Sequence, residues 1–363
     1  MDVEERLRLI KLPPTEEIVT EEELKELLET KKHPRAYDGF ETSGLLHLGS
    51  GILRAIKLQD FLDAGCKFTL YIADWFAYLN NKLGGDLELI RKTGEYYIEG
   101  WKACGVNMEK VDVVWASDLA QSPEYWETFL KISKHVTLNR VKRTVTIMGR
   151  KETEIKQFAF LVYPIMQATD IFMLKADICQ LGIDQRKVNM LAREIGPKIG
   201  FWKPVVVSHH LLMGLQGPTR MGGFEEDKKL DTQISSKMSK SKPMTAVFIH
   251  DTPDEIRVKI KRAYCLARDV KTNPILEIVK YIIFRKFKTF VVERAEKYGG
   301  TVEYVSYSEV EKDFAQGKLH PLDLKNAVAE YLIKIIDPVR RHFERNPKAR
   351  KLYEIVKEAQ ITR

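Results

Sequence analysis

The chain has 363 residues and a net charge of +8, and its length suits two domains or one large domain with an appendage. Because 44% of its residues are hydrophobic, it can bury a sizeable core. No apolar run approaches the length of a membrane span and the start has no signal-peptide core, so we expect no membrane partner. The four cysteines contain no C-x-x-C pair, which argues against a zinc site or disulfide frame and favours the reducing cytoplasm.

Residues 1–30 form an acidic N-terminal segment, with ten acidic and four basic residues. Residues 15–32 are predicted to form an amphipathic helix that Thr20 can cap, with Ile18, Leu24, Leu27 and Leu28 as its apolar stripe. We therefore expect a helical extension over residues 1–34, to which no role is assigned.

The next stretch alternates strands and helices. Strands are predicted at 35–40, 68–74 and 111–117, with helices at 49–64 and 86–104 between them. This order at this spacing favours a parallel sheet with right-handed crossovers, as in a Rossmann-type α/β domain.

Residues 119–160 interrupt the alternation with helical segments, and we interpret them as an insertion between two halves of a nucleotide-binding fold. The part from 134 to 151 carries six basic residues and no acid, which suits a nucleic-acid backbone but is also common on solvated helix faces. A helix at 163–174 with Pro164 in its first turn, a strand at 177–180, a helix at 185–194 and a strand at 205–211 follow.

Residues 214–236 are rich in glycine and charge and are predicted to form a mobile loop. The α/β domain should span 35–246, and an all-α domain should fill 247–363 with main helices at 278–290, 323–336 and 346–360. A second basic excess lies at 334–363, where nine basic residues face four acids.

One turn has the composition of a phosphate site. Between residues 37 and 51 a buried strand end leads into a helix start, with His47 and Gly49 where free N–H groups and the positive end of the helix dipole would lie. A plain strand-to-helix turn with a surface histidine explains this stretch equally well. It is not a P-loop, because Ser50 follows Gly49 without a Lys-Ser or Lys-Thr pair.

Two further stretches fit a nucleotide. Lys237-Met238-Ser239-Lys240-Ser241, at residues 237–241, can act as a flexible cationic clamp on a polyphosphate, although most lysine pairs are merely solvated. Gly182-Ile183-Asp184-Gln185 joins a strand end to a helix start, where a carboxylate and an amide can bind ribose hydroxyls.

The pairing of a His-x-Gly turn with a Lys-Met-Ser-Lys-Ser loop resembles the class I aminoacyl-tRNA synthetases. Three more stretches, at 37–41, 163–170 and 320–325, resemble the tyrosyl-tRNA synthetases of the archaeal and eukaryotic type. The resemblance covers about 35–341, and only the N-terminal segment and the loop at 217–235 lack a clear counterpart. It implies a tyrosine–tRNA ligase that forms tyrosyl-adenylate from ATP and transfers tyrosine to the 3′ end of tRNA(Tyr).

The resemblance implies two small-molecule sites. For tyrosine, Tyr37 and Asp170 would bind the phenol and Tyr163, Gln167 and Gln185 the α-amino group, with Gly39 and Glu41 alongside. For ATP, the implied residues are His47, Gly49, Gly182, Asp184, Lys237 and Lys240, of which His47, Gly49 and the two lysines would be catalytic. ATP would arrive with Mg²⁺, and no structural metal or prosthetic group is expected. Ser50 departs from the family's usual His or Asn, so a direct role for it is in doubt.

The resemblance also implies a tRNA interface and a homodimer formed through the insertion. Arg143 and Arg186 would contact the acceptor end, and Tyr298, His320 and Asp323 would contact the anticodon. Without the resemblance, Tyr298 could equally be a core residue, and His320 and Asp323 could simply shape or cap the following helix.

Two rival functions share many of these motifs. A tryptophanyl-tRNA synthetase has the same architecture, but the Tyr37 and Asp170 pair argues against it because an indole offers one N–H donor and no hydroxyl. A catalytically silent RNA-binding paralogue would not need His47, Asp184, Lys237 and Lys240, all of which are present.

Overall fold

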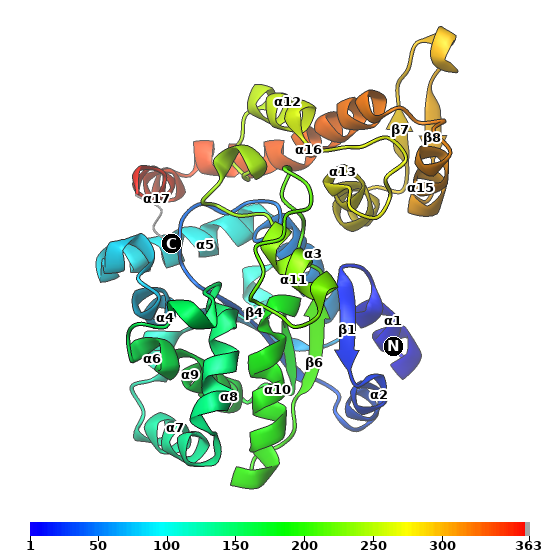
Figure 1. The fold of residues 1–363 in the computed structure, drawn as a ribbon. Coiled ribbons are helices and arrows are strands. Elements are labelled where there is room, and N and C mark those ends of the chain that lie inside the picture. The colour runs from blue at the N-terminus through cyan, green and yellow to red at the C-terminus, as the bar shows by residue number, and fades with distance from the viewer. Residues whose placement is uncertain (360–363) are drawn as a thin grey trace.

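The computed structural model describes residues 1–359 and places a six-stranded sheet at the centre of the chain (Figure 1). The strand order is β1-β6-β5-β2-β3-β4, and all neighbours are parallel except β1 and β6. The strands are β1 Thr15–Val19, β2 Arg35–Phe40, β3 Lys67–Ile72, β4 Val111–Trp115, β5 Ile178–Gly182 and β6 Val205–His209. The predicted Rossmann-type α/β fold is confirmed.

The chain order reverses between β2 and β5, which lie side by side in the middle of the sheet. In open α/β sheets, ligands bind at such a switch point, outside the carboxyl ends of the strands. The ends of β2 and β5 carry the Tyr37–Glu41 and Gly182–Gln185 stretches, so the fold brings these two predicted motifs to one place.

Two hydrophobic cores lie on opposite faces of the sheet because successive strand residues point to opposite sides. In β6, Val205 and Val207 enter one core and Val206 the other. The first core receives helices α1 Val3–Lys11, α2 Glu21–Thr30, α3 Ile52–Asp63 and α5 Leu87–Ala103. The second receives α4 Asp74–Leu79, α6 Ala116–Leu119, α7 Pro123–His135, α9 Ala159–Met173 and α10 Arg186–Ile195.

The helix predicted at 15–32 is wrong in its first half. Residues Thr15–Val19 form strand β1, which pairs antiparallel with β6 at the sheet edge, and the helix begins only after Thr20. The Thr20 hydroxyl accepts from the Glu23 amide at 3.2 Å, and the Glu23 carboxylate accepts from the Thr20 amide at 3.3 Å. These two hydrogen bonds form a capping box that starts α2. The N-terminal segment is therefore partly a strand of the central sheet.

Two other local predictions need correction. Helix α9 begins at Ala159, so Pro164 lies inside the helix rather than in its first turn. The segment predicted as a mobile loop at 214–236 ends in a helix, α11 Lys228–Ser236, which Asp227 caps by accepting from the Leu230 amide at 2.8 Å. The insertion contains α7 and α8 Leu138–Thr144, followed by short 3-10 turns at Val145–Met148 and Glu152–Glu154, as its helical composition predicted.

The C-terminal part packs over α3 and α5 (Figure 1). It is mostly helical, with α12 Pro253–Arg262, α13 Pro274–Ile278, a π-helical stretch at Val279–Ile283, α14 Phe284–Lys286, α15 Tyr307–Ala315, α16 Pro321–Arg345 and α17 Pro347–Glu358. The expectation of an all-α domain needs one correction, because β7 Phe290–Val292 and β8 Val302–Tyr304 form a small antiparallel hairpin. Residues 360–363, the end of the predicted domain and last helix, lie outside the described residues.

The buried core continues from the sheet into the C-terminal helices without a break, through Ala246, Val247 and Ile249. The exact domain boundary stays a prediction. No helix within residues 1–359 is both long and apolar enough to cross a membrane.

Candidate active site

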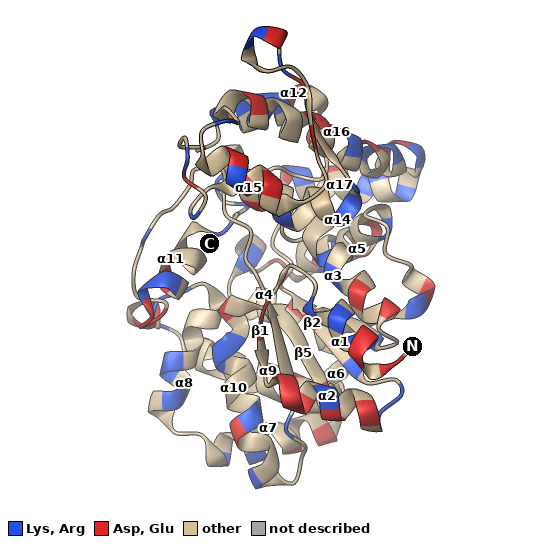
Figure 2. Ribbon diagram, turned by 90° about the vertical axis from the view of Figure 1, so that its right-hand side faces the viewer, with Lys and Arg blue, Asp and Glu red and all other residues tan. Residues whose placement is uncertain are grey.

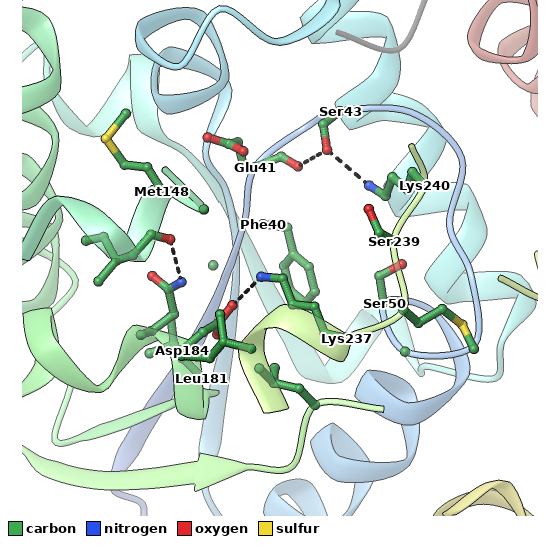
Figure 3. Close-up of a pocket in the computed structure, with 18 of the residues that line it drawn as sticks. Phe40, Glu41, Ser43, Ser50, Met148, Leu181, Asp184, Lys237, Ser239 and Lys240 are labelled. Carbon is green, nitrogen blue, oxygen red and sulfur yellow. Dashed lines mark hydrogen bonds and ion pairs between the residues drawn. The ribbon is translucent and has the colours of Figure 1, made fainter. Parts of the chain in front are cut away.

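A cavity of about 570 Å³ opens at the carboxyl ends of the strands, at the switch point between β2 and β5. Its walls come from the ends of β2, β3, β5 and β6, from α9, and from the segment that carries Lys237 and Lys240 (Figure 3). All residues predicted to bind tyrosine line this cavity: Tyr37, Gly39, Glu41, Tyr163, Gln167, Asp170 and Gln185.

The deep end of the cavity is a buried carboxylate with phenols around it. The Tyr125 hydroxyl donates to Asp170 Oδ1 at 2.9 Å, whereas within residues 1–359 Asp170 Oδ2 and the hydroxyls of Tyr37 and Tyr71 have no partner at hydrogen-bond distance. Burial raises the pKa of Asp170 to about 8, and the hydrogen bond from Tyr125 opposes that rise. The carboxyl group can therefore exchange a proton near neutral pH.

A second polar group forms around Glu41, just beyond the end of β2. The Asn80 amide donates to Glu41 Oε1 at 2.7 Å, and the Tyr163 hydroxyl donates to the same oxygen at 3.4 Å. Lys82 lies 3.6 Å from the other carboxylate oxygen. These contacts hold a carboxylate at the cavity wall, where it can face a cationic ammonium group.

The two predicted glutamines contact each other directly. Gln167 Nε2 donates to Gln185 Oε1 at 3.1 Å, and Gln185 Nε2 donates to the carbonyl of Ile147 at 3.0 Å. This chain of hydrogen bonds links α9 to the start of α10 and orients both amides beside the cavity.

His47 lies in the turn that leads into α3 and is 8% exposed. Burial and the nearby Lys240, Lys237 and Arg54 lower the pKa of His47 to about 3, so the imidazole is neutral at physiological pH. Its Nδ1 accepts from the Gly49 amide at 3.1 Å, which leaves the proton on Nε2. A neutral imidazole of this tautomer can donate one hydrogen bond to a phosphate oxygen.

Gly49 and Gly51 give that turn its close packing. A Cβ on Gly49 would lie 3.1 Å from the His47 ring, and one on Gly51 would lie 2.9 Å from Ile249. The Ser50 hydroxyl accepts from the His47 amide at 3.1 Å, so Ser50 shapes the turn from within.

Two lysines of the segment at 237–241 stand over the cavity, each held by a local partner (Figure 3). Lys237 Nζ lies 2.6 Å from Asp184 Oδ2. Lys240 Nζ donates to the Tyr97 hydroxyl and, at 3.3 Å, to Ser43 Oγ. A cationic clamp requires ammonium groups that can turn toward a polyphosphate. Lys237 would do so by giving up its ion pair, and Lys240 by giving up its hydrogen bonds to neutral hydroxyls.

Gly182 does not line the cavity itself. A Cβ there would lie 2.5 Å from Asp184 Oδ1 and 2.8 Å from Leu211, so the glycine makes room for the Asp184 carboxylate. Lys237 holds the pKa of Asp184 below its usual value despite burial. Nearby, Arg54, which lines the cavity, forms an ion pair with the buried Asp38.

The residues predicted to contact tRNA lie outside the cavity. Arg143 is exposed at the end of α8, and Arg186 at the start of α10 pairs with Glu17 at 2.9 Å. Tyr298 is 63% exposed in the loop between β7 and β8, which excludes the core-packing alternative. His320 accepts from the Leu322 amide at 3.1 Å and so caps α16, whose first turn contains Asp323.

Basic residues are spread over the faces that carry these predicted contacts (Figure 2). Lys and Arg positions mark α8 and the neighbourhood of α16 and α17, whereas acidic residues are frequent on α2. The acidic N-terminal segment and the two basic stretches of the sequence thus lie on different elements of the fold.

Several site residues were not predicted from the sequence. Tyr71 and Tyr125 surround Asp170, Asn80 and Lys82 hold Glu41, and Tyr97 holds Lys240. Tyr71 had one usable signal, since it lies next to the last residue of a buried strand whose carboxyl end must reach the ligand edge of the sheet. The others lie on helices or turns away from the strand ends and carried no such signal.

His210, at the cavity rim, joins parts of the chain that are distant in sequence. Its Nδ1 lies 3.1 Å from Glu16 of β1, its Nε2 lies 3.1 Å from Glu277 of α13, and its ring stacks on Tyr281. Gln233 of α11 donates to Nδ1 at 2.9 Å when that nitrogen is unprotonated. The two carboxylates raise the pKa of His210 to about 9 in spite of burial.

His210→Gln is expected to weaken the pH dependence of stability between pH 6.5 and 9. Because the folded-state pKa lies above the ordinary value of 6.5, the stabilisation is complete below pH 6.5 and is lost as pH rises through about 9. At about 1.36 kcal/mol per pKa unit, wild type should lose up to about 3 kcal/mol more than the variant. Urea unfolding of both proteins at pH 6 and 9.5 measures this difference, and equal losses would contradict it.

Comparisons with known proteins agree on one family. Residues 29–337 match the family described as tRNA synthetases class I (W and Y). The chain is 47% identical to the tyrosine–tRNA ligase of Pyrococcus furiosus over 378 aligned residues, covering 100% of both chains. It is 45% identical to the cytoplasmic tyrosine–tRNA ligase 1 of Arabidopsis thaliana over 365 aligned residues, covering 100% of this chain and 90% of the other.

Among solved structures, the tyrosyl-tRNA synthetase of Pyrococcus horikoshii, complexed with L-tyrosine, superimposes with a TM-score of 0.90. It is 45% identical in sequence, and the match covers 98% of this chain and 100% of the other. The chain therefore belongs to the class I tRNA synthetases for tryptophan and tyrosine, and within them to the tyrosyl-tRNA synthetases.

Proposed function

We propose that this tyrosyl-tRNA synthetase activates L-tyrosine with ATP in the cavity at the switch point and transfers it to tRNA(Tyr). The observation that carries the proposal is the deep end of the cavity, where the Tyr37 hydroxyl and Asp170 Oδ2 are buried without partners. A phenol that donates to Asp170 and accepts from Tyr37 satisfies both atoms at once.

The same end of the cavity argues for tyrosine over the other aromatic amino acids. Phenylalanine leaves both polar atoms unpaired in a buried site, and sites of this kind reject the analogue without a hydroxyl by roughly 10⁴- to 10⁵-fold. An indole can donate one N–H to Asp170 but has no acceptor for the Tyr37 hydroxyl.

The substrate's ammonium group would lie toward Gln167, Gln185 and Tyr163, with Glu41 supplying negative charge behind Tyr163. This orientation points the substrate carboxylate away from Asp170 and toward the His47 turn. ATP would lie along that turn, with its ribose near Asp184 and its phosphates between His47 and the two lysines.

Catalysis would consist of positioning and charge stabilisation. The tyrosine carboxylate attacks the α-phosphorus, the bond to pyrophosphate breaks, and the negative charge that builds up on the phosphates is met by His47 Nε2–H, Lys237 and Lys240. Lys237 would exchange its contact with Asp184 for a phosphate, which frees the carboxylate for the ribose. Mg²⁺ would come with ATP, because enzymes that use nucleotides bind it mainly through substrate phosphates and water.

For tRNA, Arg143 and Arg186 would contact the acceptor end, and the hairpin between β7 and β8 together with the start of α16 would contact the anticodon. The exposed Tyr298 ring can stack on an unpaired base, and the Asp323 carboxylate can accept from a base edge. His320 would act by shaping the helix start, since its Nδ1 is occupied by the Leu322 amide.

Asp323→Ala is expected to lower the rate of tRNA charging roughly 10-fold or more while leaving tyrosine-dependent exchange of pyrophosphate into ATP nearly unchanged. Exchange should not change because Asp323 does not line the cavity where the adenylate would form. Charging should slow because the loss of a hydrogen bond to a base edge costs about 1–3 kcal/mol. Aminoacylation and exchange assays on the same preparation measure the split. Equal losses in both assays would mean that Asp323 only supports α16.

A homodimer through the insertion is supported by an exposed apolar surface on α7 and the start of α8. Trp126, Leu130 and Leu138 are 41%, 61% and 57% exposed, and the first two share one helix face. Sedimentation of wild type and of Leu130→Glu would test this part of the proposal. We also propose a cytoplasmic location, which the free cysteines at 66, 104, 179 and 265 support.

The decisive experiment is ATP–pyrophosphate exchange with tyrosine, tryptophan and phenylalanine offered separately. We expect exchange with tyrosine alone at matched concentrations. Exchange driven by tryptophan, or by none of the three, would contradict the proposed function.

A further inference from the structure

The deep end of the cavity contains one more unpaired polar atom than the pair described above. Within the described part of the chain, the buried atoms there without a hydrogen-bond partner are the Tyr37 hydroxyl, the Tyr71 hydroxyl and Asp170 Oδ2. The three residues are 1%, 2% and 0% exposed. Leaving a buried polar group unpaired is costly, so three such atoms in one pocket indicate that the pocket binds a ligand of matching polarity.

Strand register places Tyr71 in this group. Tyr71 of β3 pairs with Gly39 of β2, and a Cβ on Gly39 would lie 3.5 Å from the Tyr71 ring and 3.8 Å from the Tyr37 ring. The two rings stand edge to face, with centroids 6.5 Å apart. Burial raises the pKa of both phenols, and the negative charge of Asp170 adds to the rise in each.

We propose that Tyr71 is a third direct ligand of the substrate's phenol hydroxyl and therefore a specificity-determining residue, an inference that rests on the proposed function. A phenol hydroxyl has one proton to donate and two lone pairs to accept. Asp170 Oδ2 accepts the hydrogen bond that the substrate's hydroxyl donates, and the hydroxyls of Tyr37 and Tyr71 donate hydrogen bonds to its two lone pairs. The three unpaired atoms of the cavity match this capacity one for one.

Tyr125 provides a contrast within the same cluster. Its hydroxyl also lies against Asp170, at 2.9 Å from Oδ1, but Tyr125 does not line the cavity, whereas Tyr71 does. Tyr125 is thus a positioning residue that holds Asp170 from behind. Tyr71 stands on the substrate's side of the carboxylate.

The test compares Tyr71→Phe with Tyr125→Phe in ATP–pyrophosphate exchange driven by tyrosine and by phenylalanine. With Tyr71→Phe we expect kcat/KM for tyrosine to fall roughly 10-fold, because one hydrogen bond to the substrate is lost. We expect kcat/KM for phenylalanine to rise a few-fold, because the variant no longer buries an unpaired hydroxyl beside that substrate. Tyr125→Phe should give no gain with phenylalanine, since it removes a partner that Asp170 keeps in every state.

A parallel loss for both substrates in Tyr71→Phe, or an unchanged tyrosine-to-phenylalanine ratio, would overturn the proposal. A second measurement uses the ligand-free protein. Removing an unpaired buried hydroxyl should leave the melting temperature of Tyr71→Phe equal to or above that of wild type, and a clear drop would show that the hydroxyl already has a partner in the protein. Failure of the proposed function itself is a different result, namely absence of tyrosine-dependent exchange in wild type.

Discussion

Asp170→Asn is expected to lower kcat/KM for tyrosine in adenylate formation by roughly 10²-fold or more. The carboxylate is fully buried, accepts from Tyr125 through one oxygen and has the other free for the substrate. An amide of the same shape cannot offer an acceptor on both sides, so either Tyr125 or the substrate phenol faces a donor. A buried donor left without an acceptor, together with the lost charge, costs about 3 kcal/mol, which is roughly 10²-fold in rate.

Asp118→Asn is the matched control, because it makes the same chemical change on an exposed residue of α6 that does not line the cavity. Pyrophosphate exchange over a range of tyrosine concentrations separates kcat from KM for both variants. Near-wild-type tyrosine kinetics in Asp170→Asn would contradict the assignment of Asp170 to the phenol.

The raised pKa of Asp170, about 8, has a measurable consequence for binding. A phenol that donates to the ionised carboxylate stabilises the charged form, so tyrosine binding should lower this pKa and release up to one proton at pH 7. Calorimetric titrations in two buffers with different ionisation enthalpies measure the released protons. Asp170→Asn should abolish the release, since an amide has no proton to lose in this range.

Lys240→Ala is expected to reduce kcat for adenylate formation roughly 10²- to 10³-fold while KM for tyrosine changes little. Lys240 is held by Tyr97 and Ser43, and neither contact reaches the deep end where tyrosine would bind. Its ammonium group is useful when negative charge moves onto the pyrophosphate, and removing one preorganised charge-stabilising group commonly costs this much.

Lys228→Ala provides the control, because Lys228 is exposed at the start of α11 and lies outside the cavity. Single-turnover formation of tyrosyl-adenylate isolates the chemical step from product release. A Lys240→Ala protein with unchanged kcat and a raised KM for ATP would show that the lysine only binds the ground state.

Much of the α/β domain was predictable because its parallel strands are buried on both faces. Continuous apolar runs such as Phe68 to Ile72 cannot lie elsewhere without exposing their side chains, whatever the rest of the chain does. Strand β1 could not be found in this way. Two of the five residues of Thr-Glu-Glu-Ile-Val are acidic, and the segment is a strand only because the edge of β6, about 190 residues away, offers hydrogen-bond partners.

The same distinction applies to the C-terminal hairpin and to α11. Strands β7 and β8 have three residues each and are stabilised by pairing and by burial of Phe290, Val292 and Tyr304 against the C-terminal helices. Helix α11 is mostly polar and follows a glycine-rich segment, so the sequence indicated a loop where Asp227 in fact caps a helix.

The amino-acid sequence by itself determined the motifs of this protein. Each motif is a short stretch whose turn or helix face follows from the spacing of its own residues, as for His47, for Lys237 and Lys240, and for the residues of α9. The tertiary structure alone decided what each motif faces. Tyr71 and Tyr125 meet Asp170 across 99 and 45 residues, because parallel strands and the helices above them bring distant segments to one edge of the sheet.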